Sequence, residues 1–112
     1  MRKSLLSCAM IIGALVCFSN AGWAQTSEKA KAGREIAERF CARCHAIGPE
    51  SKSPHESAPP FRLIVAKGHL ENLEEALGEG IVVGHPDMPQ FQFSPQNVGA
   101  LVAYLKSLGG KG

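Results

Sequence analysis

The sequence predicts an all-α fold of three to four helices. In several segments apolar residues recur at three- and four-residue steps, which is the spacing of one helix face. Segments rich in glycine and proline separate these periodic stretches, and they mark the loops. Because no pattern of alternating strands and helices is visible, we expect helices packed against helices.

The first and last helices have the clearest sequence patterns. We expect the first over residues 29–44, after a polar segment. Five of its residues share one face: Gly33, Ile36, Ala37, Phe40 and Cys44. The last helix should start at Pro95, since Ser94 can cap it and proline suits the first helical position. It should end at Gly109-Gly110.

Two shorter helices are expected between them. The apolar residues 61–66 suit a strand or a helix, but the prolines before them and Gly68 after them keep the element short, and we expect a helix. Residues 70–77 place three leucines on one side, which predicts another helix. The prolines and glycines of residues 47–60 and 78–93 predict loops.

The first 24 residues resemble a secretory leader. Two basic residues open the segment and an apolar run covers residues 5–18. Gly22 and Ala24 then offer small side chains at the −3 and −1 positions of a cleavage site after residue 24. The apolar run falls short of the roughly 20 residues that span a bilayer. We therefore expect residues 1–24 to be a cleaved signal peptide. A single domain of residues 25–112, without a membrane span, would then act in the periplasm.

Loss of the leader changes the charge and the residue inventory. The full chain has 12 basic and 10 acidic residues, and the leader holds two of the basic ones. A mature chain with no net charge gives no support to nucleic-acid binding. Of four cysteines and three methionines, only Cys41, Cys44 and Met88 lie beyond the leader.

The segment Cys41-Ala42-Arg43-Cys44-His45 has the spacing of covalent haem attachment. Each thiol can add to one vinyl group of a haem, and His45 is then placed to bind the iron. A structural zinc site needs four ligands, and no second cysteine pair is present. A thioredoxin-like redox pair belongs near a βαβ unit, and a plain disulfide leaves His45 unexplained. Haem is therefore the favoured cofactor.

Met88 is the candidate for the second iron ligand. It lies between Pro86 and Pro89, in a segment too polar for the hydrophobic core. The two prolines restrict the backbone of this loop and could hold the Met88 sulfur in place. A thioether ligand favours reduced iron and raises the potential. Packing of a core gap is the alternative for Met88. His85 is the rival ligand, and it would give a bis-histidine iron.

The chain resembles the small bacterial class I c-type cytochromes over nearly all of residues 25–112. The residues that carry the resemblance are Cys41 to His45, the pair Met88-Pro89 and the run of residues 101–106. The resemblance implies the class I cytochrome c fold, with helices around one covalently bound haem c ligated by His45 and Met88. It further implies that the first and last helices cross at Gly33 and Tyr104, and that the Pro59 carbonyl accepts a hydrogen bond from His45.

The function implied by this resemblance is that of a soluble electron carrier that is not an enzyme. The expected partners are redox proteins such as a periplasmic dehydrogenase, reductase or terminal oxidase, and the chain is expected to be a monomer. Expected pocket or core residues are Phe40, Phe61, Phe91, Leu101 and Leu105. Because the only tryptophan lies in the leader, Arg62 is the suggested partner for a haem propionate. The alternatives are a haem subunit of a larger complex, or a small enzyme or sensor with an open or bis-histidine iron.

Overall fold

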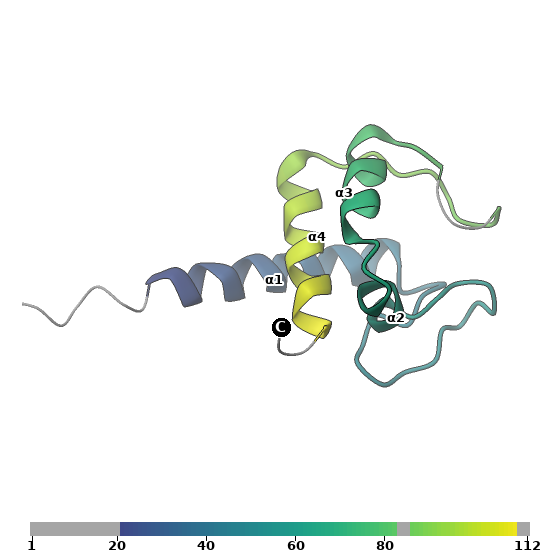
Figure 1. The fold of residues 1–112 in the computed structure, drawn as a ribbon, viewed down its shortest axis with the longest axis horizontal. Helices are drawn as coiled ribbons and strands as arrows, with labels where there is room; N and C mark the ends of the chain where they lie inside the picture. The colour runs from purple at the N-terminus through teal and green to yellow at the C-terminus, as the bar shows by residue number, and fades with distance from the viewer. Residues whose placement is uncertain (1–20, 83–85, 110–112) are drawn as a thin grey trace, which may run out of the picture.

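The computed structural model describes residues 21–82 and 86–109. It contains four helices: α1 (Ala21–Phe40), α2 (Phe61–Ala66), α3 (Leu70–Glu79) and α4 (Pro95–Leu108) (Figure 1). No strand occurs within the described ranges, so the all-α prediction is confirmed. The leader expected over residues 1–24 lies mostly outside these residues.

The boundaries predicted for the first helix were wrong at both ends. The helix already covers residues 21–28, which include the strong helix formers alanine, glutamine and glutamate. At its other end the amides of Cys41 and Ala42 both donate to the Ala37 carbonyl, at 2.9 Å each. The bond from Ala42 to Ala37 spans six residues, and a bond of this span closes the C-terminal end of many helices. Residues 41–44 therefore form turns beyond α1.

Helix α4 begins and ends where the sequence predicts. The Ser94 hydroxyl accepts a hydrogen bond from the Asn97 amide, and Pro95 occupies the first turn. The C-cap residue is Gly109. Because the cap and the proline both satisfy the requirements of the first turn, the start of this helix is fixed by local sequence alone.

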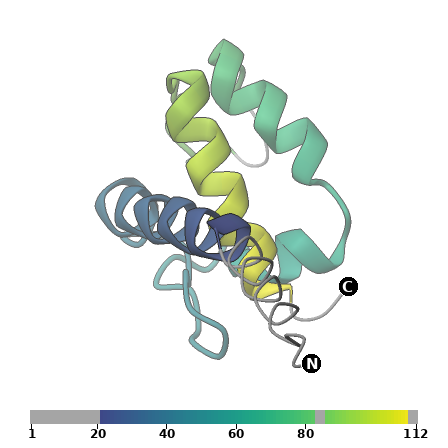
Figure 2. The ribbon, with the colours of Figure 1, turned by 90° about the vertical axis from the view of Figure 1, so that its left-hand side faces the viewer.

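Helices α1 and α4 cross each other (Figure 2), and Gly33 lies at the crossing. A Cβ atom built on Gly33 would lie 1.9 Å from the Ala100 carbonyl oxygen and 2.9 Å from the Tyr104 Cβ. Only glycine permits so close an approach of the two backbones. The Tyr104 hydroxyl then donates to the Ile47 carbonyl at 2.8 Å, which ties α4 to the segment after His45.

The two middle helices pack on α4 as well. The short helix predicted for residues 61–66 is present as α2. Helix α3 runs two residues beyond the predicted end at residue 77 and stops where Gly80 adopts a left-handed conformation, with φ 74°. In the described part of the chain, no helix combines the length and the apolar character that crossing a membrane requires.

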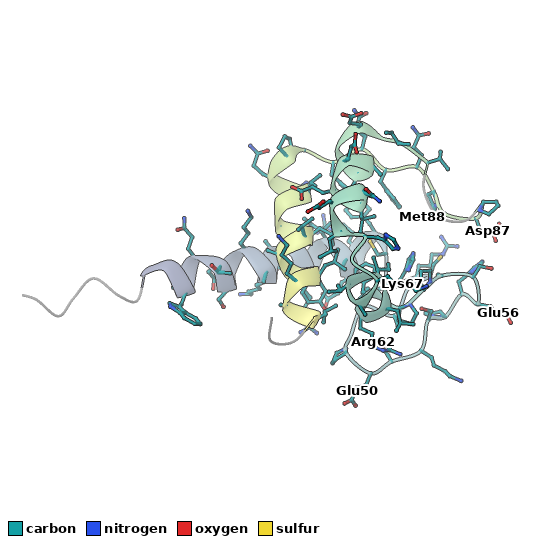
Figure 3. All side chains as sticks on the ribbon, viewed as in Figure 1. Glu50, Glu56, Arg62, Lys67, Asp87 and Met88 are labelled. Atoms are coloured by element: carbon teal, nitrogen blue, oxygen red, sulfur yellow. The ribbon has the colours of Figure 1, made fainter. Side chains whose placement is uncertain are left out.

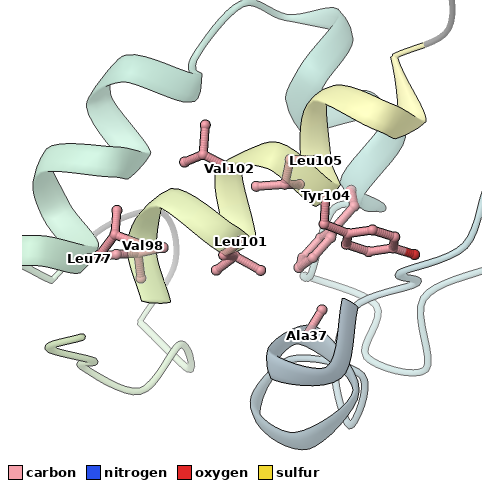
Figure 4. Packing of buried hydrophobic residues seen from close by; sticks show 8 residues of the cluster. Ala37, Leu77, Val98, Leu101, Val102, Tyr104 and Leu105 are labelled. Carbon is pink, nitrogen blue, oxygen red and sulfur yellow. The ribbon is translucent and has the colours of Figure 1, made fainter. Parts of the chain in front are cut away.

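The hydrophobic core lies between α4 and the other three helices (Figure 4). Its buried members are Ala37, Phe61, Leu77, Val98, Leu101, Val102, Tyr104 and Leu105. Most of them belong to α4, so this helix is the central element of the fold. The core continues into the wall of the cavity described next.

Candidate haem-binding site

A cavity of about 550 Å³ opens beside the core and is bordered by all four helices. This volume lies within the range of about 300–1,000 Å³ that is typical of small-molecule and cofactor sites. The walls are mainly apolar, and they include Ile64 of α2, Leu73 and Leu77 of α3, and Leu101 and Leu105 of α4. Such walls exclude water from a bound group and lower the local dielectric.

Cys41, Cys44 and His45 all line this cavity. The amides of Cys44 and His45 donate to the Cys41 carbonyl at 3.1 and 2.9 Å, and this turn brings the three side chains to one wall. No disulfide joins the two cysteines. Burial, together with the nearby Cys44, raises the pKa of the Cys41 thiol to about 11. A thiol that stays protonated at neutral pH is poorly suited to disulfide exchange, in which the thiolate is the nucleophile.

The His45 ring is buried and oriented by the backbone of Pro59. Its Nδ1 lies 2.7 Å from the Pro59 carbonyl oxygen. A carbonyl can only accept, so Nδ1 carries the proton and Nε2 keeps the lone pair that a metal ion requires. The Phe61 amide donates to the Ala46 carbonyl at 2.9 Å, and this bond holds the two chain segments side by side. These two hydrogen bonds fix the orientation of the imidazole.

Met88 lies on the loop between α3 and α4 and also lines the cavity. Two hydrogen bonds, one to α3 and one to its C-cap residue Gly80, anchor the part of the loop that follows Met88. The Gln90 side-chain amide donates to the Gly80 carbonyl, and the Phe93 amide donates to the Leu77 carbonyl at 2.8 Å. The structure thus brings Met88 to the same cavity as the Cys41 to His45 segment. The rival ligand His85 lies outside the described residues.

Three phenylalanines form an aromatic cluster at the cavity. Phe91 and Phe93 stack with their ring centres 5.5 Å apart, and Phe40 meets both rings edge-on. Phe40 belongs to the cavity wall as expected, but it is 43% exposed and is not a core residue. Its position at the end of α1, next to the turn, places it at the rim.

Several polar residues at the cavity were not singled out by sequence reasoning. They are Arg39, Arg43, His69, Asn72 and Asp87. Nothing in their sequence context distinguishes them from ordinary surface residues. Arg62, which was suggested as a propionate partner, does not line the cavity, and its guanidinium instead donates to the Ser51 carbonyl at 2.7 Å. That suggestion is therefore not supported.

Residues 30–109 match the family model described as cytochrome c. The chain belongs to the cytochrome c family. This cytochrome is also 29% identical over 76 residues to cytochrome c-552 of Bradyrhizobium diazoefficiens, a match that covers 68% of this chain and 71% of that protein. No solved structure gives a significant match. Together with the four helices and the CxxCH segment, these matches identify a small class I c-type cytochrome.

Family membership implies covalently bound haem c, and the donor set of the cavity fits it. Cys41 and Cys44 supply two unpaired thiols on one wall, and His45 supplies an imidazole nitrogen with a lone pair. A zinc site has no comparable support, because no three His, Cys, Asp or Glu side chains gather as metal ligands among the described residues. The cytochrome therefore belongs to the haem-based electron carriers.

Proposed function

We propose that this cytochrome is a periplasmic one-electron carrier with one haem c per chain, ligated by His45 and Met88. The observation that supports it best is the convergence on one cavity of Cys41, Cys44, His45 and Met88, with the imidazole already oriented by Pro59. Bound haem supplies a reversible one-electron iron couple. The residues of the chain hold it, set its potential and limit the access of water.

Each of these residues has a distinct task in the proposal. Cys41 and Cys44 fix the macrocycle covalently, so the cofactor stays with the carrier. The hydrogen bond from His45 to Pro59 fixes the ring and increases the donor strength of Nε2. Met88, as the second ligand, closes the iron to exogenous ligands. A closed iron site suits electron transfer and excludes catalysis at the metal.

The remaining parts of the proposal follow from the sequence. Residues 1–24 are removed on export, residues 25–112 form a monomeric domain, and covalent attachment of haem takes place outside the cytoplasm. The partners are redox proteins such as a dehydrogenase, a reductase or a terminal oxidase of the same compartment. Intact-mass measurement of the exported protein tests three parts of this at once: removal of the leader, one haem per chain, and its covalent attachment.

Visible spectroscopy of the purified ferric protein and of Met88→Ala tests the ligand pair. The wild-type protein should be low-spin and show the weak long-wavelength sulfur-to-iron band. Met88→Ala should lose that band, bind carbon monoxide when reduced and have a lower potential, because the thioether stabilises reduced iron. Leu73→Ala is the matched control, since Leu73 lines the same cavity without a donor atom, and it should keep the band.

Two outcomes would contradict the proposed ligation. A wild-type protein that lacks the sulfur-to-iron band and loses its low-spin spectrum in His85→Ala would have a bis-histidine iron. A high-spin wild-type protein that binds carbon monoxide would have an open iron, and the enzyme or sensor class would then replace the electron carrier.

A further inference from the structure

The segment that carries Met88 also approaches the loop that follows His45. Asp87, the residue before Met88, places its Oδ2 3.6 Å from Nε2 of His55. Figure 3 shows Asp87 and Met88 on one loop and Glu56, the neighbour of His55, on another loop that extends on the same side of the molecule. His55 thus connects the loop of one proposed iron ligand to that of the other.

His55 is held in place by three hydrogen bonds to its own loop and the cysteine turn. Its amide donates to the Cys44 carbonyl at 3.1 Å, and its carbonyl accepts from the Ala58 amide at 3.1 Å. The Ser57 amide donates to the ring Nδ1 at 3.2 Å. Because Nδ1 accepts a hydrogen bond, the ring proton lies on Nε2, the nitrogen that faces Asp87.

The separation of 3.6 Å is longer than a direct hydrogen bond, and it suits a contact that tightens or that a water molecule bridges. The neutral ring already directs an N–H group at the Asp87 carboxylate, so the contact is attractive without a charged imidazole. On its other side, the Met88 loop is held by hydrogen bonds from Gln90 and Phe93 to the C-cap and last turn of α3. His55 supplies the contact on the side that α3 does not reach.

We propose that His55 is a positioning residue that, through Asp87, holds the Met88 segment against the cavity and so favours coordination of the sulfur over its displacement. This inference rests on the proposed His45/Met88 ligation. It assigns to His55 a role in ligand exchange at the iron, without contact to the haem itself. The turn that carries the covalent attachment thereby helps to keep the second ligand in place.

The test is a titration of the ferric holoprotein with imidazole, which competes with Met88 for the iron and abolishes the sulfur-to-iron band. His55→Ala should tighten imidazole binding about 1.5- to fivefold, which is the range measured for exposed polar pairs. Asp87→Ala should have a similar effect. The double variant should match the single variants, because the same contact can be lost only once. His55→Gln, whose amide can donate to Asp87, should restore much of the wild-type affinity.

Glu56→Gln is the matched control, because it removes a neighbouring exposed charge from the same loop, and it should leave imidazole binding unchanged. The backbone bonds of His55 survive every substitution of its side chain, and far-ultraviolet circular dichroism checks that the fold does too. Unchanged imidazole affinity in His55→Ala, or additive effects in the double variant, would overturn the proposed role of His55 but not the proposed His45/Met88 ligation. Absence of the sulfur-to-iron band in the wild-type protein would overturn the ligation and this inference together.

Discussion

Replacement of Gly33 by alanine should destabilise the fold more than the same replacement at any other glycine in the described helices. The new Cβ would lie 1.9 Å from the Ala100 carbonyl oxygen, whereas ordinary contacts begin at 3.4 Å, so the two backbones must separate by about 1.5 Å. No side-chain rotation relieves this clash, because the obstacle is the backbone of α4. Overpacking of this kind costs about 3 kcal/mol. The better helix propensity of alanine offsets about 1 kcal/mol, which leaves a net loss of at least about 2 kcal/mol.

The assay is chemical and thermal unfolding of the ferric holoprotein, followed by circular dichroism. A loss of about 2 kcal/mol corresponds to a decrease in Tm of roughly 8–16 °C for a domain of this size. Gly78→Ala in α3 is the matched control, because a Cβ there has no neighbour within 4 Å, and it should raise stability by about 0.5–1 kcal/mol. If Gly33→Ala remained within about 0.5 kcal/mol of the wild-type protein, the close crossing of α1 and α4 would be refuted.

Further predictions concern a helix cap, a buried phenol and the iron-binding imidazole. Ser94→Ala removes the hydroxyl that accepts from the Asn97 amide and should cost about 1 kcal/mol in unfolding experiments. Burial raises the pKa of Tyr104 above its ordinary value of 10.0. The charge of Arg34 lowers this pKa and the charge of Glu38 raises it, but burial has the largest effect. Stability from this phenol is therefore complete below pH 10 and is lost as the pH rises further, because the unfolded chain ionises first. The single tyrosine gives one NMR signal for this titration, and a midpoint at or below 10 would contradict the prediction. His45→Ala should prevent accumulation of normal holoprotein, and a full yield of protein with a native-like spectrum would exclude the proposed role.

Local chemistry made the start and end of α4 and the haem-attachment segment predictable. Ser94 and Pro95 act on the first turn of α4 through their own backbone neighbours, so their effect can be read from sequence. The same holds for the spacing of Cys41, Cys44 and His45. The end of α1 was not predicted correctly because the amides of Cys41 and Ala42 both donate to the Ala37 carbonyl, which ends the helix there. This arrangement depends on the direction of the chain after residue 42, which the local sequence does not show.

Contacts between loops were beyond the reach of sequence reasoning. His55 and Asp87 lie in separate irregular segments without periodicity, and only the packing of the helices brings them to 3.6 Å. Likewise, Arg62 was suggested as the partner of a haem propionate because no tryptophan lies beyond the leader, yet its guanidinium donates to the Ser51 carbonyl. In each case the side-chain environment is set by tertiary structure, which the local pattern does not contain.

Two hydrogen bonds hold together the ends of the loop that follows His45, and they allow the length of this loop to vary. Bonds from His45 to Pro59 and from Phe61 to Ala46 close its base, at 2.7 and 2.9 Å. Doubling the length of a flexible loop costs only about 0.6 kcal/mol of closure entropy. Additional residues in the exposed segment 49–52 should therefore leave the imidazole geometry intact, and the chain has room there to acquire a new surface without altering its redox centre.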